Sequence, residues 1–314
     1  MSEDAFVKEA EQLRRELLAY CYRLTGSVHD AEDLVQEAML LGWRSYARFR
    51  GEATVRTWLY RIATNAFLSS TRRRRRLPSD LGPPTTDVSL DAVLDEECAW
   101  VEPLPDALVC TDADPAKLVI ERDRLRLALV ASLQRLPARQ RGALLLREAL
   151  DFSAAEIGDA LEISVPAVKS LLQRARATLE TIDDTPHEAD EPTARRLLET
   201  YMRAFESSDI RLLERTLCGD AMLEMTPART WFSGLVTCLP YLRTVIGQPG
   251  EWSMRPTRAN GQPAAVVYRW GELLGVAVLG LRDGGIARIS LFGDPAVATR
   301  FNAPGAGKAS REGG

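Results

Sequence analysis

The chain of 314 residues is long enough for two or three domains, and its net charge of −4 is mild. That mild charge hides an uneven distribution, because residues 78–117 hold ten acidic side chains and one basic one while the segments on either side are basic overall. The two histidines and five widely spaced cysteines fit neither a zinc site nor a secreted disulfide framework, and no apolar run reaches about 18 residues, so we expect a cytoplasmic protein without a metal, a cofactor or a membrane segment.

The first 45 residues predict two helices joined by a short break. Residues 4–24 repeat apolar side chains at helical spacing, and Gly26 ends that helix. Ser27, followed three residues later by Asp30, is typical of a capped helix start. The second helix is expected to expose an acidic face, which in most proteins is simply solvated. Its expected buried stripe is Ala31, Leu34, Val35, Ala38 and Leu41.

A third helix, from about Val55, is aromatic at first and then strongly basic. Its expected buried stripe is Val55, Leu59, Ile62 and Ala66, and its expected outer residues are Arg56, Tyr60, Arg61, Thr64 and Asn65. Between Thr57 and Arg76 there are six arginines and no acid, with aromatic residues interleaved. Such a mixture binds backbone phosphates and offers rings to unstacked bases, which predicts single-stranded nucleic acid as a ligand. The alternative is a core helix that ends in a solvated cationic tail.

Two stretches in this part of the chain carry a family resemblance: DAEDLVQEAML and FRGEATVRTWLYRIATNAFLSSTRRRRR. They resemble region 2 of the extracytoplasmic-function (ECF) RNA polymerase sigma factors. In that family the acidic helix docks on the β′ subunit of core RNA polymerase, and the following loop and helix open the minus-ten promoter element and hold the displaced strand. The resemblance implies a polymerase-binding set: Asp30, Glu32, Asp33, Gln36 and Glu37. It also implies a set for minus-ten DNA: Phe49, Arg56, Tyr60, Arg61, Asn65, Arg72 and Arg73.

Residues 78–117 are expected to form an acidic, proline-rich linker. Fully extended, its roughly 40 residues span at most about 130 Å, enough to let two DNA-binding modules lie far apart on one promoter. In sigma factors the corresponding linker enters the polymerase cleft, and a plain solubilising tether is the alternative. Four of its residues are apolar enough to dock on a surface that the sequence does not identify: Trp100, Val101, Leu104 and Leu108.

Residues 118–182 predict a helical module that ends in a helix-turn-helix, after helices over 118–136 and 139–150. Ser153 and Glu156 form a capping box that opens a short helix, and a longer helix follows with Pro166 in its first turn. This longer helix is expected to bury Val168, Leu172, Ala175 and Leu179. Its opposite face is polar and basic, which suits the major groove of DNA.

The stretch FSAAEIGDALEISVPAVKSLLQRARATL resembles sigma region 4, which binds the minus-thirty-five promoter element. The resemblance implies DNA contacts from five residues: Lys169, Ser170, Gln173, Arg174 and Arg176. Leu171 departs from the family, which often has arginine there, so that contact is not expected.

After a short acidic linker at 183–192, residues 193–303 predict an α+β domain, and residues 304–314 a disordered tail. Its expected elements are helices at 193–206, 210–217 and after Ser233, a strand at 221–225, and strands at 253–259, 264–270, 273–281 and 286–292. The stretches YMRAFESSDIRLLERTLCGDAMLEMTP and ANGQPAAVVYRW…LFGDP resemble the SnoaL-like domain of the nuclear-transport-factor-two superfamily, a cone of helices and sheet. The expected fold class is multidomain: two all-α sigma domains followed by this α+β cone.

The SnoaL-like resemblance implies a pocket between sheet and helices. Candidate lining residues are Met225, Trp231, Tyr241, Tyr268 and Phe292, although such residues more often form core. The charged candidates for chemistry are Glu224, Arg255 and Arg269. Strand alternation places Glu224 opposite Leu223 and Met225, and so is expected to point it outwards. With no acid–base pair in evidence, we expect no catalytic residue and no enzyme.

These observations predict a sigma factor that binds core RNA polymerase through its β′ and β subunits and binds promoter DNA in double- and single-stranded form. Residues 1–77 would act as region 2 and residues 118–182 as region 4, while the SnoaL-like domain modulates them through contacts with region 2 or the linker. One alternative is a SnoaL-like enzyme or ligand sensor on a DNA-binding adaptor, which requires an inward-facing carboxylate. Another is a helix-turn-helix repressor, which has no use for a strand-separating helix.

Overall fold

The computed structural model describes residues 3–49, 51, 53–70, 74–87, 94–95, 97–109, 125–180 and 190–302. The chain forms two compact units. The first unit consists of Met1–Arg75, Leu108–Cys110 and Leu127–Asp184, and the second of Arg76–Ala107, Thr111–Arg126 and Thr185–Gly314. Within the described ranges, no helix combines the length and the hydropathy that a membrane crossing requires.

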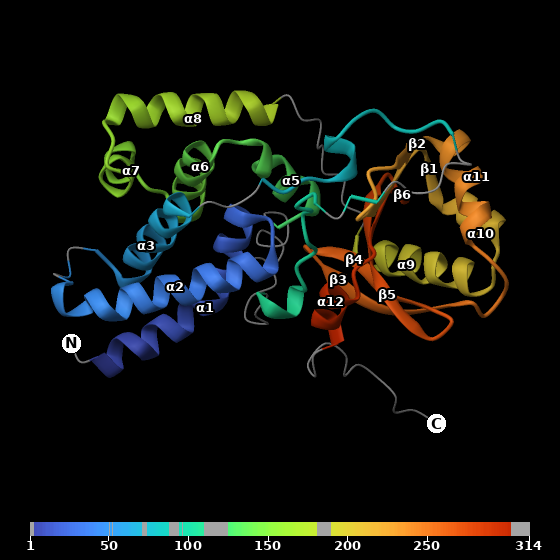
Figure 1. Ribbon diagram of the computed structural model, residues 1–314, viewed down its shortest axis with the longest axis horizontal. Helices are drawn as coiled ribbons and strands as arrows, with labels where there is room; N and C mark the ends of the chain where they lie inside the picture. The colour runs from blue at the N-terminus through green and yellow to red at the C-terminus, as the bar shows by residue number, and fades with distance from the viewer. Residues whose placement is uncertain are drawn as a thin grey trace. The chain divides into compact units, whose positions relative to one another are not determined.

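The first unit begins with three helices that pack on one another (Figure 1). They are α1 (Glu3–Thr25), α2 (Val28–Ser45) and α3 (Val55–Ser69), with the short helix η1 (Tyr46–Arg48) between the last two. The Ser27 hydroxyl accepts a hydrogen bond of 3.2 Å from the Asp30 amide, which confirms the predicted start of α2. Thr54 caps α3 in the same way, through the Thr57 amide at 3.1 Å.

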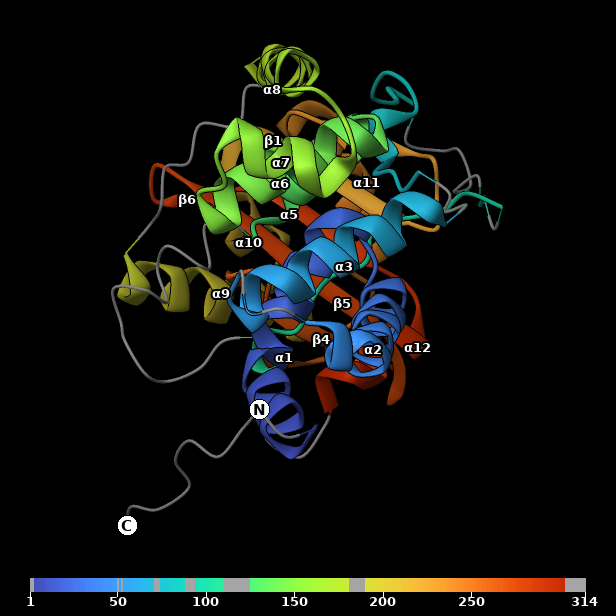
Figure 2. The same cartoon turned by 90° about the vertical axis from the view of Figure 1, so that its left-hand side faces the viewer.

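Four further helices of this unit lie within the described residues. They are α5 (Leu127–Arg135), α6 (Ala138–Leu150), α7 (Ala154–Leu161) and α8 (Val165–Glu180). The predicted capping box is present, because Ser153 accepts from the Glu156 amide and the Glu156 carboxylate accepts from the Ser153 amide. Figure 2 shows α6 and α7 beside α3, in agreement with their contacts, while α8 packs on α6 and α7.

The helix expected over 118–136 starts later than predicted, at Leu127. Residues 118–124 lie outside the described residues, and Leu125 and Arg126 are not helical. The reason is a competing partner, since the Leu125 carbonyl accepts a hydrogen bond of 2.7 Å from the Asn260 side chain. An amide four residues further on would take that place in a helix.

The second unit is built on a six-stranded sheet with the order β2-β1-β6-β5-β4-β3. All neighbouring strands are antiparallel except β1 and β6, which are parallel. From residue 190 onwards its described helices are α9 (Glu191–Glu206), α10 (Ile210–Thr216), α11 (Leu235–Val245), α12 (Pro295–Thr299) and η4 (Arg300–Asn302). Its strands are β1 (Leu217–Thr226), β2 (Trp231–Ser233), β3 (Trp252–Ala259), β4 (Gln262–Arg269), β5 (Glu272–Arg282) and β6 (Gly285–Phe292). The predicted α+β order is confirmed, and β2 is a strand that the sequence pattern did not predict.

One face of the sheet packs on α9, α10 and α11, and alternate strand residues such as Leu223, Ala265 and Ile289 point into this core. The register of the strands places Glu224 opposite Trp231 and Ser290, and therefore on the other face. Residues on that face are buried as well, for example Val266 and Val278. Both faces are therefore covered, as in a three-layer arrangement rather than a sheet with one wet side.

Part of the covering layer is the segment 76–107, which belongs to the second unit although it follows the third helix of the first. Its residues Val101 and Leu104 are fully buried. The amide of Leu104 donates to Asn260 Oδ1 at 2.8 Å, and the Leu104 carbonyl accepts from the Asn260 amide at 2.9 Å. The Asp106 carboxylate accepts from the Gly261 amide at 2.8 Å. Leu104 and Asp106 of the expected linker thus dock on the C-terminal domain, which a plain tether would not do, whereas Leu108 belongs to the first unit.

Replacing Asn260 with alanine should loosen this docked segment. The change removes the partners of the Leu104 amide and the Leu125 carbonyl, and each buried group left without a hydrogen bond costs about 1–3 kcal/mol. We expect a lower free energy of unfolding in urea and faster proteolysis within 101–107.

Asp283→Ala is the matched control. Asn260 and Asp283 both occupy the first turn position of a hairpin with positive φ, 56° and 51°, but Asp283 is exposed and has no docked segment to hold. In both variants alanine must adopt a left-handed backbone conformation, which lowers the free energy of unfolding by a similar amount. Equal proteolysis of the two variants within 101–107 would contradict the role given to Asn260.

Candidate nucleic-acid interface

A carboxylate on α1 holds two of the residues expected to bind minus-ten DNA. Glu16 Oε1 accepts hydrogen bonds from Arg56 Nε at 2.8 Å and from the Tyr60 hydroxyl at 2.7 Å. Burial alone would raise the pKa of Glu16, but the hydrogen bonds from Arg56 and Tyr60 outweigh it and hold that pKa below its usual value of 4.5. Sequence reasoning missed Glu16, because nothing local marks an acid on one helix as the partner of a base on another.

The expected exposure of Tyr60 and Thr64 is wrong. Tyr60 is 1% exposed, and its ring lies 4.5 Å from that of Tyr20. The Thr64 and Tyr20 hydroxyl groups form a hydrogen bond of 2.7 Å. The helix buries two sides rather than one because α1 and α2 cover one of them and α6 another, while Ile62 is only half-buried. Tyr60 is therefore not available to stack on a base in this conformation.

Other residues of the expected minus-ten set remain accessible on α3. Asn65 is exposed, Arg61 is half-buried and the Arg56 side chain is 40% exposed beside Glu16. Arg72 and Arg73 lie outside the described residues. Of the described arginines that follow α3, Arg75 forms an ion pair of 2.8 Å with Asp30, so it joins the end of the basic run to the start of α2.

Phe49 belongs to an aromatic cluster at one end of the first unit. Its ring stacks on Tyr46 at 5.8 Å and lies 4.8 Å from Trp58, and Phe6 packs on Tyr46 at 4.8 Å. Phe49 and Trp58 are half-buried, so each still presents part of a ring to the outside. The sequence singled out Phe49 by resemblance and did not predict its partners Phe6 and Tyr46.

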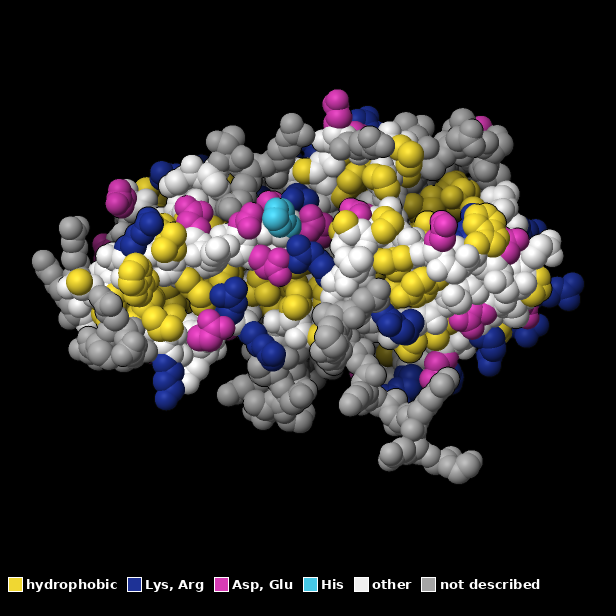
Figure 3. Space-filling model, turned by 60° about the horizontal axis from the view of Figure 1, so that its bottom comes forward, with side chains coloured by type: hydrophobic (Ala, Val, Ile, Leu, Met, Phe, Trp, Pro, Cys, Tyr) yellow, Lys and Arg dark blue, Asp and Glu magenta, His cyan; other side chains and the backbone are white. Residues whose placement is uncertain are grey.

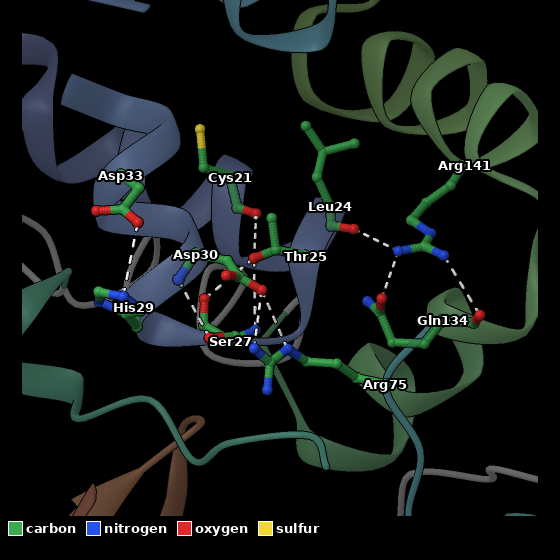
Figure 4. Close-up of polar contacts among 10 residues, drawn as sticks. All are labelled: Cys21, Leu24, Thr25, Ser27, His29, Asp30, Asp33, Arg75, Gln134 and Arg141. Carbon is green, nitrogen blue, oxygen red and sulfur yellow. Dashed lines mark hydrogen bonds and ion pairs between the residues drawn. The ribbon is translucent and has the colours of Figure 1, made fainter. Parts of the chain in front are cut away.

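The outer face of α2 is acidic, as expected, with Asp33, Gln36 and Glu37 exposed. Figure 3 shows acidic side chains gathered around the side chain drawn in cyan. On α2, His29 Nε2 lies 3.6 Å from the Asp33 carboxylate (Figure 4). Glu32 is half-buried, and the Asp30 carboxylate is already engaged by Arg75. Asp30 therefore also has a role in the fold.

Apolar side chains extend this acidic face, which the sequence pattern did not predict. Leu40, Leu41 and Trp43 are all at least 40% exposed, and the expected burial of Leu41 is wrong. The buried stripe continues through Gly42 instead, where a Cβ would stand 3.0 Å from Leu59 and 3.1 Å from Phe6. Neighbouring charged and apolar groups of this kind are typical of a surface that binds a protein.

The long helix α8 presents the expected minus-thirty-five residues together. Val168, Leu172 and Ala175 are buried against the rest of the unit, while Leu179 is half-buried. The opposite face exposes Lys169, Ser170, Gln173, Arg174 and Arg176. Five polar or basic side chains on one face of a helix can reach base edges and phosphates in a major groove.

The candidate pocket of the C-terminal domain is only partly brought together. Met225 and Tyr241 are half-buried and pack against the core, where the Tyr241 hydroxyl contacts Met225 Sδ at 3.2 Å and the Tyr241 ring stacks on Phe232. Trp231, Tyr268 and Phe292 lie outside that core cluster. Trp231 contacts the docked segment instead, because its Nε1 donates to the Gly82 carbonyl at 2.9 Å.

The predicted exposure of Glu224 is wrong, although its predicted direction, away from Leu223 and Met225, agrees with the register. Glu224 is 1% exposed because the docked segment covers its face of the sheet. It accepts hydrogen bonds from the Ser79 amide at 3.3 Å and the Ser290 hydroxyl at 3.3 Å. The other charged candidates also lie outside the core cluster: Arg255 is exposed, and Arg269 lies over the rings of Trp252 and Trp270.

Comparison with known proteins accounts for both helical parts of the chain. Residues 10–77 match the family described as Sigma-70 region 2, and residues 126–179 match the one described as Sigma-70, region 4. The ECF RNA polymerase sigma factor SigG of Mycobacterium tuberculosis is 43% identical over 313 residues, which covers 95% of this chain and 84% of SigG. The ECF RNA polymerase sigma factor SigW of Bacillus subtilis is 31% identical over 179 residues, covering 56% of this chain and 88% of SigW.

A solved structure extends the likeness to the C-terminal domain. The crystal structure of the extracytoplasmic function sigma factor SigJ of Mycobacterium tuberculosis superposes with a TM-score of 0.62 at 23% identity. The superposition covers 93% of this chain and 98% of SigJ, so the shared fold includes the helices and sheet that follow the helix-turn-helix.

Replacing Glu16 with glutamine should make the first unit less stable at neutral pH than at acid pH, relative to the parent chain. Because the folded pKa of Glu16 is lowered, its contribution is present above the unfolded value of 4.5 and is lost as the pH falls through the folded value. The difference in free energy of unfolding between parent and variant should therefore shrink as the pH is taken from 7 to below about 4.

Glu11→Gln, an exposed position on the same helix, is the control and should show little difference at either pH. A parent-to-variant difference for Glu16→Gln that stays constant from pH 7 to pH 3 would contradict the ionic role of this carboxylate.

Proposed function

Because the chain belongs to the ECF family of RNA polymerase sigma factors, we propose that its promoter-reading and polymerase-binding work is divided among the surfaces described above. Family membership follows from 43% identity that spans 84% of SigG. A sigma factor directs core RNA polymerase to promoters and initiates transcription there. The proposed modules are residues 1–77 as region 2, 118–182 as region 4 and 193–303 as the SnoaL-like domain, with linkers at 78–117 and 183–192 and a tail at 304–314.

The proposed polymerase surface is the outer face of α2. Its acidic part is Asp33, Gln36 and Glu37, with Asp30 and Glu32 at its margin. The exposed Leu40, Leu41 and Trp43 supply apolar area that an acidic face alone lacks. A protein partner with a basic and apolar surface fits this combination, and in the family that partner is core polymerase.

The proposed minus-ten surface is the outer part of α3 and the aromatic cluster before it. Arg56, Arg61 and Asn65 supply charge and hydrogen bonds, and Phe49 supplies a ring, with Arg72 and Arg73 continuing the basic run. Binding of Arg56 to a phosphate would compete with Glu16, which already holds this guanidinium. The proposed minus-thirty-five surface is the outer face of α8. It is supported by one observation, that all five expected residues on this helix are exposed.

We infer that the SnoaL-like domain regulates this activity without catalysis. Support comes from its hold on the segment 76–107, which joins region 2 to region 4 in the sequence. The charged groups expected to do chemistry lie away from the core between sheet and helices, so the alternative of an enzyme on a DNA-binding adaptor is not favoured. The site of action is the cytoplasm, where the polymerase works.

Arg174→Ala should reduce discrimination between a cognate promoter and an unrelated duplex by about 1–3 kcal/mol, because a guanidinium that contacts a base edge contributes about that much. Titration of core polymerase and protein onto labelled duplexes measures it. Arg195→Ala, which removes an exposed arginine from α9, is the control and should leave discrimination unchanged. Identical binding of Arg174→Ala and parent to upstream promoter DNA would contradict the assignment.

Asn260→Ala should also change the yield of run-off transcription, because it releases the segment that connects the two promoter-reading modules. The yield is measured with saturating core polymerase and compared with that of Asp283→Ala. Parent-like transcription from the Asn260 variant, in a preparation whose segment 101–107 has become protease-sensitive, would leave the domain without the regulatory role proposed for it.

A further inference from the structure

The turn between β3 and β4 carries the one Asn-Gly pair of the sequence, at Asn260 and Gly261. Both residues have positive φ, 56° and 71°, and the flanking Ala259 and Gln262 are paired, which makes a two-residue hairpin turn. Asparagine before glycine is also chemically labile, because glycine has no side chain to hinder attack of its backbone nitrogen on the asparagine carboxamide. The turn is therefore a potential site of deamidation.

Deamidation of this pair needs water and no enzyme. The Gly261 backbone nitrogen gives up its proton and forms a bond to Cγ of Asn260, and the Cγ–Nδ2 bond breaks as Nδ2 takes up a proton and leaves as ammonia. Water then opens the resulting succinimide ring by adding a hydroxyl group to one of the two ring carbonyl carbons and a proton to the ring nitrogen. The product at position 260 is aspartate, or isoaspartate when water attacks the backbone carbonyl carbon, and nothing is oxidised or reduced.

In the folded chain, the groups that would react are held by other segments of the second unit. The Asn260 carboxamide accepts from the Leu104 amide through Oδ1 at 2.8 Å and donates through Nδ2 to the Leu125 carbonyl at 2.7 Å, which fixes its orientation. The Gly261 amide donates to the Asp106 carboxylate at 2.8 Å, and a negative charge at that distance opposes loss of the amide proton. Asn260 is also fully buried, which keeps water away from it.

Arg258 holds the Asp106 carboxylate in place beside the turn. Its Nε donates to Asp106 Oδ2 at 3.3 Å, and its Nη2 donates to the Gly261 carbonyl at 2.6 Å. Its Nη1 donates to Glu191 Oε1, at the start of α9, at 3.1 Å. Departure of the segment 104–106 would therefore release the Gly261 amide and open the turn to water at the same time.

We propose that the Asn260-Gly261 pair is a latent deamidation site that the docked segment 104–106 protects, and that deamidation prevents this segment from docking again. A carboxylate at position 260 has no donor for the Leu125 carbonyl and adds a second buried negative charge close to Asp106. Isoaspartate also adds one carbon atom to the backbone of a two-residue turn, which the register of β3 and β4 does not accommodate. Local opening of the segment is reversible, whereas the change at Asn260 is permanent.

Peptide mass spectrometry of the full chain, incubated at mildly alkaline pH, measures the conversion of amide to acid at Asn260. The folded parent should deamidate there at least tenfold more slowly than the same chain in urea, where the turn is exposed. Leu104→Asp, which puts a charge at a fully buried position, should raise the rate in the folded protein at least tenfold. Ala107→Asp, at an exposed position of the same segment, is the matched control and should keep the parent rate. Asn65, which is exposed on α3 and followed by alanine, should stay an amide over the same period.

The variant Asn260→Asp carries the product and gives a second test. Protease should cut its segment 101–107 at least tenfold faster than that of the parent, whereas Gln248→Glu, the same kind of change at an exposed position of the second unit, should leave the cutting rate unchanged.

Two results would overturn the protection of Asn260. One is an equal deamidation rate for the parent when folded and in urea, and the other is a parent-like rate in Leu104→Asp although its segment 101–107 has become protease-sensitive. Protease resistance of Asn260→Asp equal to that of the parent would overturn the permanent effect. If Leu104→Asp does not fold, the folded and unfolded parent and Asn260→Asp decide between these outcomes.

Discussion

A backbone carbonyl that leaves water must be given a donor, and the last carbonyls of α1 receive theirs from residues more than a hundred positions away. The Gln134 side-chain amide donates to the Arg23 carbonyl, and the Arg141 guanidinium donates to the Leu24 carbonyl (Figure 4). Breaking these hydrogen bonds is costly, because without water or another partner it would leave two carbonyls, an amide and a guanidinium buried and without hydrogen bonds. It is also reversible, since all four groups are well solvated once they are exposed.

In the C-terminal domain, buried polar side chains likewise form hydrogen bonds with the backbone of distant segments. Asn260 satisfies the backbone of Leu104 and Leu125, Asp106 accepts from Gly261, and Glu224 accepts from Ser79. Each is a buried polar side chain that bonds the backbone of a segment far away in sequence. Apolar burial of Val101 and Leu104 supplies the attraction, and the polar contacts fix the register in which the segment lies.

Features with local causes could be read from the sequence. The caps at Ser27 and Ser153, the exposed face of α8 and the α+β order of the C-terminal domain follow from residues within a few positions of one another. The errors at Tyr60 and Glu224 share one cause, a packing partner that is distant in sequence. Tyr60 was expected outside because the helical period of α3 cannot show that Tyr20 and Glu16 on α1 cover it. Glu224 was expected in water because strand alternation gives a direction and cannot show that a segment 145 residues earlier covers it.

The central claim is that the promoter-reading helices are packed together in the free protein and separate when it works. Labels at Arg15 on α1 and Asp159 on α7, both exposed and outside the residues of the proposed interfaces, allow the distance between the two modules to be measured by energy transfer. The distance should be short and well defined in the free protein and should increase by tens of ångströms, on the scale of the ~85 Å between promoter elements, in the complex with core polymerase and promoter DNA. An unchanged distance in a complex that starts RNA would contradict the account.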